Sequence, residues 1–109
     1  MDERADIRIV LTTLPDAEAA RALAERLVDT GRAACVNILA PCTSVYRWQG
    51  VRETATEVPL LIKTTADGYA ALEAEIRAHH PYELPEIVAV PVVRGLPAYL
   101  DWVAAQTSC

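Results

Sequence analysis

Two adjacent histidines are the residues of this chain best suited to chemistry. His79 and His80 are the only histidines among 109 residues, and imidazole is a common ligand of copper and zinc. They follow Tyr69, Leu72 and Ile76, which recur at the spacing of one apolar helix face. Both rings should flank that face at the helix end, where imidazoles also bond the last backbone carbonyls. The pair therefore predicts either a weak metal site or a structural helix end.

The three cysteines form neither a disulfide pattern nor a metal pattern. Cys35, Cys42 and Cys109 are odd in number and lack C-x-x-C spacing. We therefore expect reduced thiols rather than a disulfide framework or a zinc ribbon. Cys35 lies in an apolar run and is predicted to be a small buried hydrophobic residue, whereas Cys109 is expected to be exposed.

Several carboxylates lie in segments that also carry a lysine and tyrosines. The set comprises Glu53, Glu57, Glu83 and Glu86, with Lys63, Tyr46 and Tyr82. Such groups can form an ion-binding or small-ligand cleft, but a glutamate beside a lysine is more often a solvated ion pair. We favour ion pairs here. We interpret Trp48 and Trp102 as packing anchors, because large aromatic side chains dominate core and interface burial.

The composition and the motifs favour a binding protein over an enzyme. The sequence contains no glycine-rich phosphate loop, no G-x-S-x-G and no H-E-x-x-H. Its net charge of -5 and pI of about 4.9 argue against a nucleic-acid partner, because neutralising phosphates needs a basic face. An acidic protein of this kind attracts cations instead.

The sequence favours a cytoplasmic location without membrane attachment. Residues 1–6 include three acidic residues and lack the apolar region of a signal peptide. No apolar run reaches the length of about 18 to 20 residues that a membrane span needs.

Alternating and helical patterns predict the elements in order. Residues 7–13 form a strand with Ile7, Ile9 and Leu11 on one face, and a helix follows that Pro15-Asp16 opens and Gly31 ends. Residues 33–48 and 51–65 form the arms of a hairpin, kinked at Pro41 and Pro59.

The second half repeats a helix and a strand. Asp67 should cap a helix over residues 67–80, which Pro81 stops. Residues 87–93 form a further strand, and residues 97–105 form a short closing helix. The order βαββαβ, followed by a helix, predicts a single α+β domain over residues 1–109. Its architecture is a ferredoxin-like sandwich with both helices on one face of an antiparallel sheet.

The predicted hairpin is longer than the helix beside it. Each arm would extend about 50 Å, whereas the helix over 67–80 spans about 21 Å. The overhanging tip carries Val45, Tyr46, Trp48 and Val51, and an isolated hairpin is marginally stable in water. We expect another copy of the chain to cover the tip; a folded-back hairpin and a different partner are the alternatives.

Several segments resemble one known family. They are Ala33-Ala34-Cys35-Val36-Asn37-Ile38, Ser44-Val45-Tyr46-Arg47-Trp48-Gln49-Gly50, Leu61-Ile62-Lys63-Thr64-Thr65, His80-Pro81-Tyr82-Glu83-Leu84-Pro85-Glu86-Ile87 and Tyr99-Leu100-Asp101-Trp102. Together they resemble the CutA divalent-cation-tolerance family over residues 7–103. The resemblance implies a ferredoxin-like subunit in a tight homotrimer. It also implies a role in the response to metal ions, chiefly copper.

The resemblance bears directly on the histidine pair. Copper-binding bacterial members of the family pair the matching histidines with a cysteine near the end of the first strand. Thr12 stands at that position, and a hydroxyl is a poor ligand for soft copper. Cys35 is an alternative source of a thiolate, although core packing is the more frequent role of such a residue. We therefore expect weak copper ion binding by His79 and His80.

Two functional classes remain open at this point. The first is a homotrimer that binds divalent metal ions and acts in metal tolerance. The second is a trimeric scaffold or sensor that binds a small ligand or a partner protein in clefts between subunits. An unrecognised hydrolase is the least favoured class.

Overall fold

The computed structural model describes residues 6–107, so the prediction for Cys109 lies outside it. Its elements follow the predicted order, with the hairpin arm before the turn divided into two strands. They are β1 (Ile7–Leu14), α1 (Ala17–Asp29), β2 (Cys35–Ile38), β3 (Cys42–Trp48), β4 (Val51–Thr65), α2 (Tyr69–His79), β5 (Val88–Pro91) and α3 (Pro97–Gln106). Within residues 6–107, no helix has the length and apolar character to cross a membrane.

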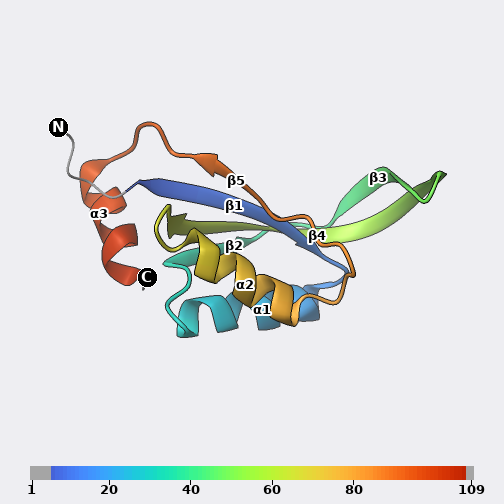
Figure 1. Ribbon diagram of the computed structural model, residues 1–109, viewed down its shortest axis with the longest axis horizontal. Helices are drawn as coiled ribbons and strands as arrows, with labels where there is room; N and C mark the ends of the chain where they lie inside the picture. The colour runs from blue at the N-terminus through green and yellow to red at the C-terminus, as the bar shows by residue number, and fades with distance from the viewer. Residues whose placement is uncertain (1–5, 108–109) are drawn as a thin grey trace.

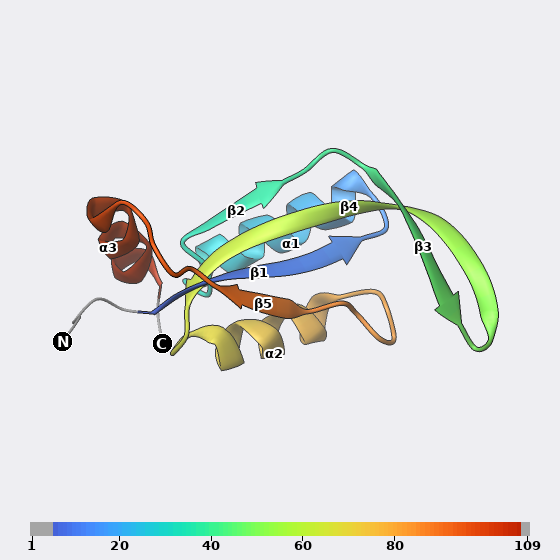
Figure 2. The ribbon, with the colours of Figure 1, turned by 90° about the horizontal axis from the view of Figure 1, so that it is seen from above.

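All strand pairings are antiparallel, and the main sheet has the order β2-β4-β1-β5. Helices α1 and α2 lie on one face of this sheet, and α3 lies at the end of the sheet where β1 begins (Figure 1). At one end of the sheet α3 packs against Ile7, and the rest of the opposite face carries no helix (Figures 1 and 2). This arrangement confirms the predicted α+β, ferredoxin-like sandwich.

The core lies between the sheet and the two helices. Val10 in β1 pairs with Ile62 in β4, and both are fully buried. Leu72 and Ile76 of α2 close the core from the helical side and are also fully buried. Strand side chains alternate between faces, so Ile9 and Leu11 point to the uncovered face instead.

Local sequence accounts for the start and end of α1. The Asp16 side chain accepts the Ala19 backbone N–H at 2.8 Å, which satisfies one free donor of the first turn. Gly31, with φ of 74°, follows the helix end in the left-handed region that favours glycine.

The predicted cap of α2 is wrong by one residue. Gly68, not Asp67, occupies the N-cap, and no side chain caps the helix. The Gly68 N–H donates to Thr65 Oγ1 at 3.0 Å, and a Cβ at position 68 would lie 3.1 Å from the same oxygen. The chain therefore passes close to the end of β4, where glycine fits better than a larger residue.

Strand β4 runs through Pro59 without a break, so that proline does not divide the hairpin arm. Pro59 pairs with Thr13 on one side, and on the other its carbonyl accepts the N–H of Leu39, just beyond β2. Proline has no N–H to donate toward β2, but β2 already ends at Ile38, so the ladder loses no hydrogen bond at this position. Pro41, in contrast, lies in the gap between β2 and β3.

The outer half of β4 pairs only with β3 and forms the overhanging hairpin (Figure 1). Gln49 and Gly50, with φ of 51° and 81°, make its turn. Positive φ at both central residues is typical of a type I′ hairpin turn. The molecule is consequently elongated, with extents of 49 × 25 × 23 Å.

Candidate functional site

The C-terminal end of α2 brings an imidazole next to a carboxylate. His79 Nε2 lies 3.1 Å from Glu75 Oε2, one helical turn earlier. Arg26 Nε of α1 donates to the same oxygen at 2.5 Å. The hydrogen bond from Arg26, aided by the charges of Arg26 and His79, lowers the pKa of Glu75. The exposed His79 ring and the other Glu75 oxygen together offer a divalent cation two ligands.

His80 is held by hydrogen bonds at both ring nitrogens. Its Nδ1 accepts the Tyr82 backbone N–H at 3.1 Å, so Nε2 carries the proton and donates to Thr13 O at 2.8 Å. Burial lowers the pKa of His80 and outweighs the opposing influence of the Thr13 carbonyl and of Glu57. The imidazole thus ties the end of α2 to β1, and it has no free nitrogen for a metal while these bonds persist.

Thr12 and Cys35 face opposite sides of the sheet. Thr12 is buried on the helical side, and its hydroxyl has no hydrogen-bond partner. Cys35 pairs with Lys63 on the uncovered side and is half-buried, so the prediction of a buried hydrophobic residue is wrong. Within residues 6–107, no three His, Cys, Asp or Glu side chains gather as a metal site. A tight metal site does not fit these residues, whereas a weak two-ligand site does.

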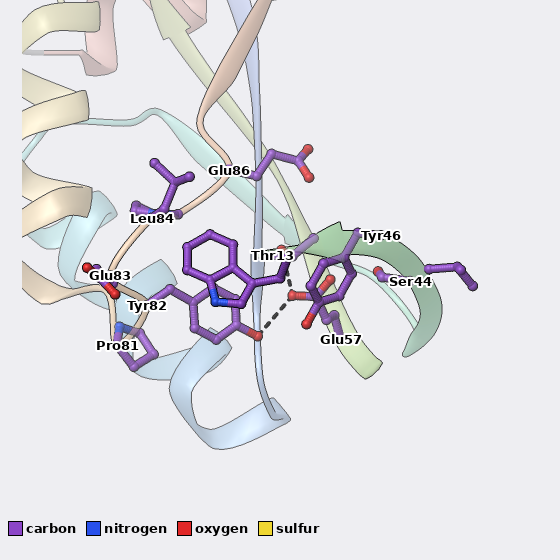
Figure 3. A pocket seen from close by; sticks show the side chains of 12 residues that line it. Thr13, Ser44, Tyr46, Glu57, Pro81, Tyr82, Glu83, Leu84 and Glu86 are labelled. Carbon is purple, nitrogen blue, oxygen red and sulfur yellow. Dashed lines mark hydrogen bonds between the residues drawn. The ribbon is translucent and has the colours of Figure 1, made fainter. Parts of the chain in front are cut away.

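A second concentration of polar groups lines a cavity of about 910 Å³ between the hairpin and residues 81–86 (Figure 3). The lining residues are Thr13, Ser44, Val45, Tyr46, Trp48, Glu57, Pro81, Tyr82, Glu83, Leu84, Pro85 and Glu86. The cavity is a broad groove that is widely open to solvent. Its volume falls in the range of about 300 to 1,000 Å³ typical of small-molecule sites.

Glu57 is the buried carboxylate of this cavity, with only 9% of its surface exposed. Its Oε2 accepts the Tyr82 hydroxyl at 2.9 Å and the Thr13 hydroxyl at 3.1 Å (Figure 3). Burial acts to raise the pKa of Glu57, but hydrogen bonds from Ser44, Tyr82 and Thr13 and the nearby His80 bring it below the ordinary value. Burial and the bond to Glu57 raise the pKa of Tyr82 to about 12.

The structure gathers part of the predicted carboxylate set and separates the rest. Glu57, Glu83, Glu86, Tyr46 and Tyr82 all line the cavity, whereas Glu53 and Lys63 do not. Lys63 instead hydrogen-bonds Asn37 on the uncovered face of the sheet. The expectation of glutamate–lysine ion pairs in this set is therefore wrong, because β4 directs Glu57 and Lys63 to different surroundings.

Some polar residues of these two sites are not evident from the sequence. Thr13 and Ser44 reach Glu57 from other strands, and no local pattern reveals such contacts. Glu75 was detectable, since a carboxylate four residues before a histidine lies beside it on a helix.

The lowered pKa of His80 predicts that acid destabilises the fold. The unfolded imidazole, with its ordinary value of 6.5, binds protons more readily than the folded one. The free energy of unfolding should therefore be fully developed above pH 6.5 and fall as the pH drops below it. Calorimetric melting at fixed protein concentration measures this. His80→Gln should show a smaller loss, and an equal loss in both proteins would contradict the assignment.

The uncovered face of the sheet is apolar at its centre. Leu11 lies between Leu61 of β4 and Val88 of β5, and Ile9 pairs with Val90. We call these five residues the open face. Val88 and Val90 remain 49% and 45% exposed, and the other three residues are half-buried. The hairpin tip is a second exposed apolar surface, and its side chains are those predicted from the sequence, namely Val45, Tyr46, Trp48 and Val51.

Comparisons with known proteins place these features in context. The family model described as CutA1 divalent ion tolerance protein matches residues 8–106. The divalent-cation tolerance protein CutA of Thermus thermophilus is 46% identical over 91% of this chain and 96% of its own length. The CutA homolog of Xenopus laevis is 43% identical over 84% of this chain and 60% of its own, longer sequence.

Solved structures give the same result. The divalent cation tolerance protein of Thermus thermophilus superposes with a TM-score of 0.92 at 45% identity, covering 94% of this chain and 99% of that one. CutA1 from Oryza sativa gives 0.94 at 36% identity, with 98% of each chain covered. A structure from Archaeoglobus fulgidus, described as a periplasmic divalent cation tolerance protein, gives 0.89 at 38% identity, covering 92% and 97%.

Proposed function

The chain belongs to the CutA1 divalent ion tolerance family, and from that membership we propose that it is a homotrimer that binds divalent cations, copper first, in the response to metal ions. The observation that carries the proposal is the His79–Glu75 pair, an exposed imidazole beside a carboxylate. Relatives that match most of this chain are named tolerance proteins, which supports binding rather than catalysis.

The homotrimer is supported by two uncovered apolar surfaces. The open face carries aliphatic side chains at its centre, and the hairpin tip exposes Val45, Tyr46, Trp48 and Val51. Contiguous apolar surface of this kind is costly in water and is typical of interfaces. A closed ring of identical chains covers both surfaces without open-ended growth.

The metal site is proposed at the end of α2. Cu²⁺ binds His79 and the free oxygen of Glu75, with water completing its coordination. His80 joins only by giving up its bond to the Thr13 carbonyl. Thr12 stands at the position that matches the cysteine of copper-binding members of the family, so this position offers no thiolate. Arg26 competes for the same carboxylate. Binding is therefore weak to moderate, and it weakens as the pH falls through the imidazole range near 6.5.

Calorimetric titration of CuCl₂ into the assembled protein tests this site. The double variant His79→Ala/His80→Ala should lose most of the affinity, and Glu75→Gln should lower it about tenfold, as expected for a lost charged ligand. Arg26→Gln should raise the affinity, because it frees the carboxylate. Copper binding by the double variant as tight as that of the wild type would sink the proposal.

The cavity beside Glu57 supports a second candidate function, a sensor that binds a small ligand. A cytoplasmic location is also proposed, since Cys35 and Cys42 are free thiols, as is usual in reducing compartments.

A further inference from the structure

Glu57 is a buried negative charge without a cationic partner. Its three donors are neutral hydroxyls, and within residues 6–107 no lysine or arginine lies within ion-pair distance of it. Buried charges in proteins are normally paired with an opposite charge or bound to a metal. The bonds from Thr13 and Tyr82 both go to Oε2, so Oε1 receives at most the bond from Ser44 and can accept a further donor.

The walls of the cavity indicate which cation would fit. The carboxylates Glu57, Glu83 and Glu86 line it, and no lysine, arginine or histidine does. Three aromatic side chains, Tyr46, Trp48 and Tyr82, also face it. Aromatic faces attract cations through their quadrupoles. They also pack well against the apolar part of a ligand.

The size of the cavity separates an organic cation from a bare metal ion. A volume of about 910 Å³ accommodates a molecule of many atoms, whereas a divalent metal would contact Glu57 and leave the aromatic walls unused. The other carboxylates, on Glu83 and Glu86, are exposed and act at a distance by favouring positive charge. The chemistry of the lining thus calls for a positive group attached to an apolar body.

We propose that this cavity binds a small organic cation, a protonated amine on an aromatic or aliphatic body, with the ammonium donating to Glu57 and the body lying against Tyr46, Trp48 and Tyr82. The proposal rests on the second candidate function, the sensor, and is independent of copper binding at His79.

Titration with phenethylamine, followed by NMR of the indole N–H signals, tests the proposal on the assembled protein. Trp48 lines the cavity and Trp102 does not, and these are the two tryptophans of the chain. The Trp48 signal should shift and saturate while that of Trp102 stays in place. The neutral analogue 2-phenylethanol should bind at least about tenfold more weakly, because it lacks the charged hydrogen bond.

Matched variants identify the role of the carboxylate. Glu57→Gln should weaken phenethylamine binding at least about tenfold, whereas Glu25→Gln, which removes the same charge from the exposed surface of α1, should not. If Glu57→Gln fails to fold, Tyr46→Phe and Tyr46→Leu replace it. The phenylalanine variant keeps the aromatic ring and should bind phenethylamine nearly as the wild type does, whereas the leucine variant should bind it several-fold more weakly.

Three results would overturn the proposal. The first is equal binding of phenethylamine and 2-phenylethanol, which would mean that charge plays no part. The second is the absence of any shift at Trp48, as expected if a second copy of the chain fills the cavity. The third is a Glu57-dependent shift with MgCl₂ that phenethylamine cannot compete away, which would identify a metal ion as the occupant. Copper binding at His79 survives each of these outcomes.

Discussion

Replacing Leu11 with lysine is expected to convert the proposed homotrimer into a monomer. Leu11 occupies the centre of the open face, flanked by Leu61 and Val88. In a single chain the new ammonium reaches water, so the fold persists. In the proposed homotrimer it would be buried against apolar side chains, which costs several kcal/mol per unpaired charge. Light scattering should then report a mass near 11.9 kDa, about a third of the value for the wild type.

The matched control is Val28→Lys. Val28 lies on α1 and is 45% exposed, so the same change there adds the same charge outside the open face. This variant should retain the wild-type mass. A Leu11→Lys protein that also retains it across micromolar concentrations would mean that the open face is not part of the interface.

Trp48→Ala is expected to loosen the assembly and to make melting depend on concentration. Trp48 ends β3 beside the hairpin turn and pairs with Val51. One side of it faces the cavity, and 39% of its surface is exposed in the single chain. The assembly would cover this remaining surface. Truncating a buried aromatic side chain typically costs about 3 to 5 kcal/mol, and in an obligate oligomer that loss lowers melting most at low concentration.

Calorimetric melting over a dilution series measures the effect. Trp48→Phe keeps an aromatic ring and should resemble the wild type much more closely than the alanine variant does. Identical melting of Trp48→Ala and wild type at every dilution would show that the tip is peripheral to the assembly.

Local patterns were sufficient to predict the fold. The alternation in residues 7–13 predicted β1, and the spacing of Leu72 and Ile76 predicted the buried side of α2. The patterns did not reveal which face of β1 packs on the helices. Both faces are rich in apolar residues, since one forms the core and the other the open face. Period alone cannot separate two apolar faces.

The candidate sites depended on contacts between distant strands. The histidine pair was visible in the sequence, but the bond from His80 to the Thr13 carbonyl joins residues 67 positions apart. Thr13 also reaches Glu57 across 44 positions. Glu57 and Lys63 lie in the same predicted strand. Only the pairing of β4 shows that Glu57 lies opposite β3 in the hairpin, whereas Lys63 lies opposite β1 in the main sheet. Burial and charge pairing of this kind arise from the tertiary fold.

Frozen-solution electron paramagnetic resonance with less than one Cu²⁺ per chain tests cation binding at His79 most directly. Nitrogen from a coordinated imidazole splits the copper signal. Free water and carboxylate ligands do not. The wild type should show this splitting near neutral pH and lose it in His79→Ala, while the control Glu25→Gln keeps it. A nitrogen splitting that is unchanged in His79→Ala, or absent from the wild type, would contradict the proposed copper site.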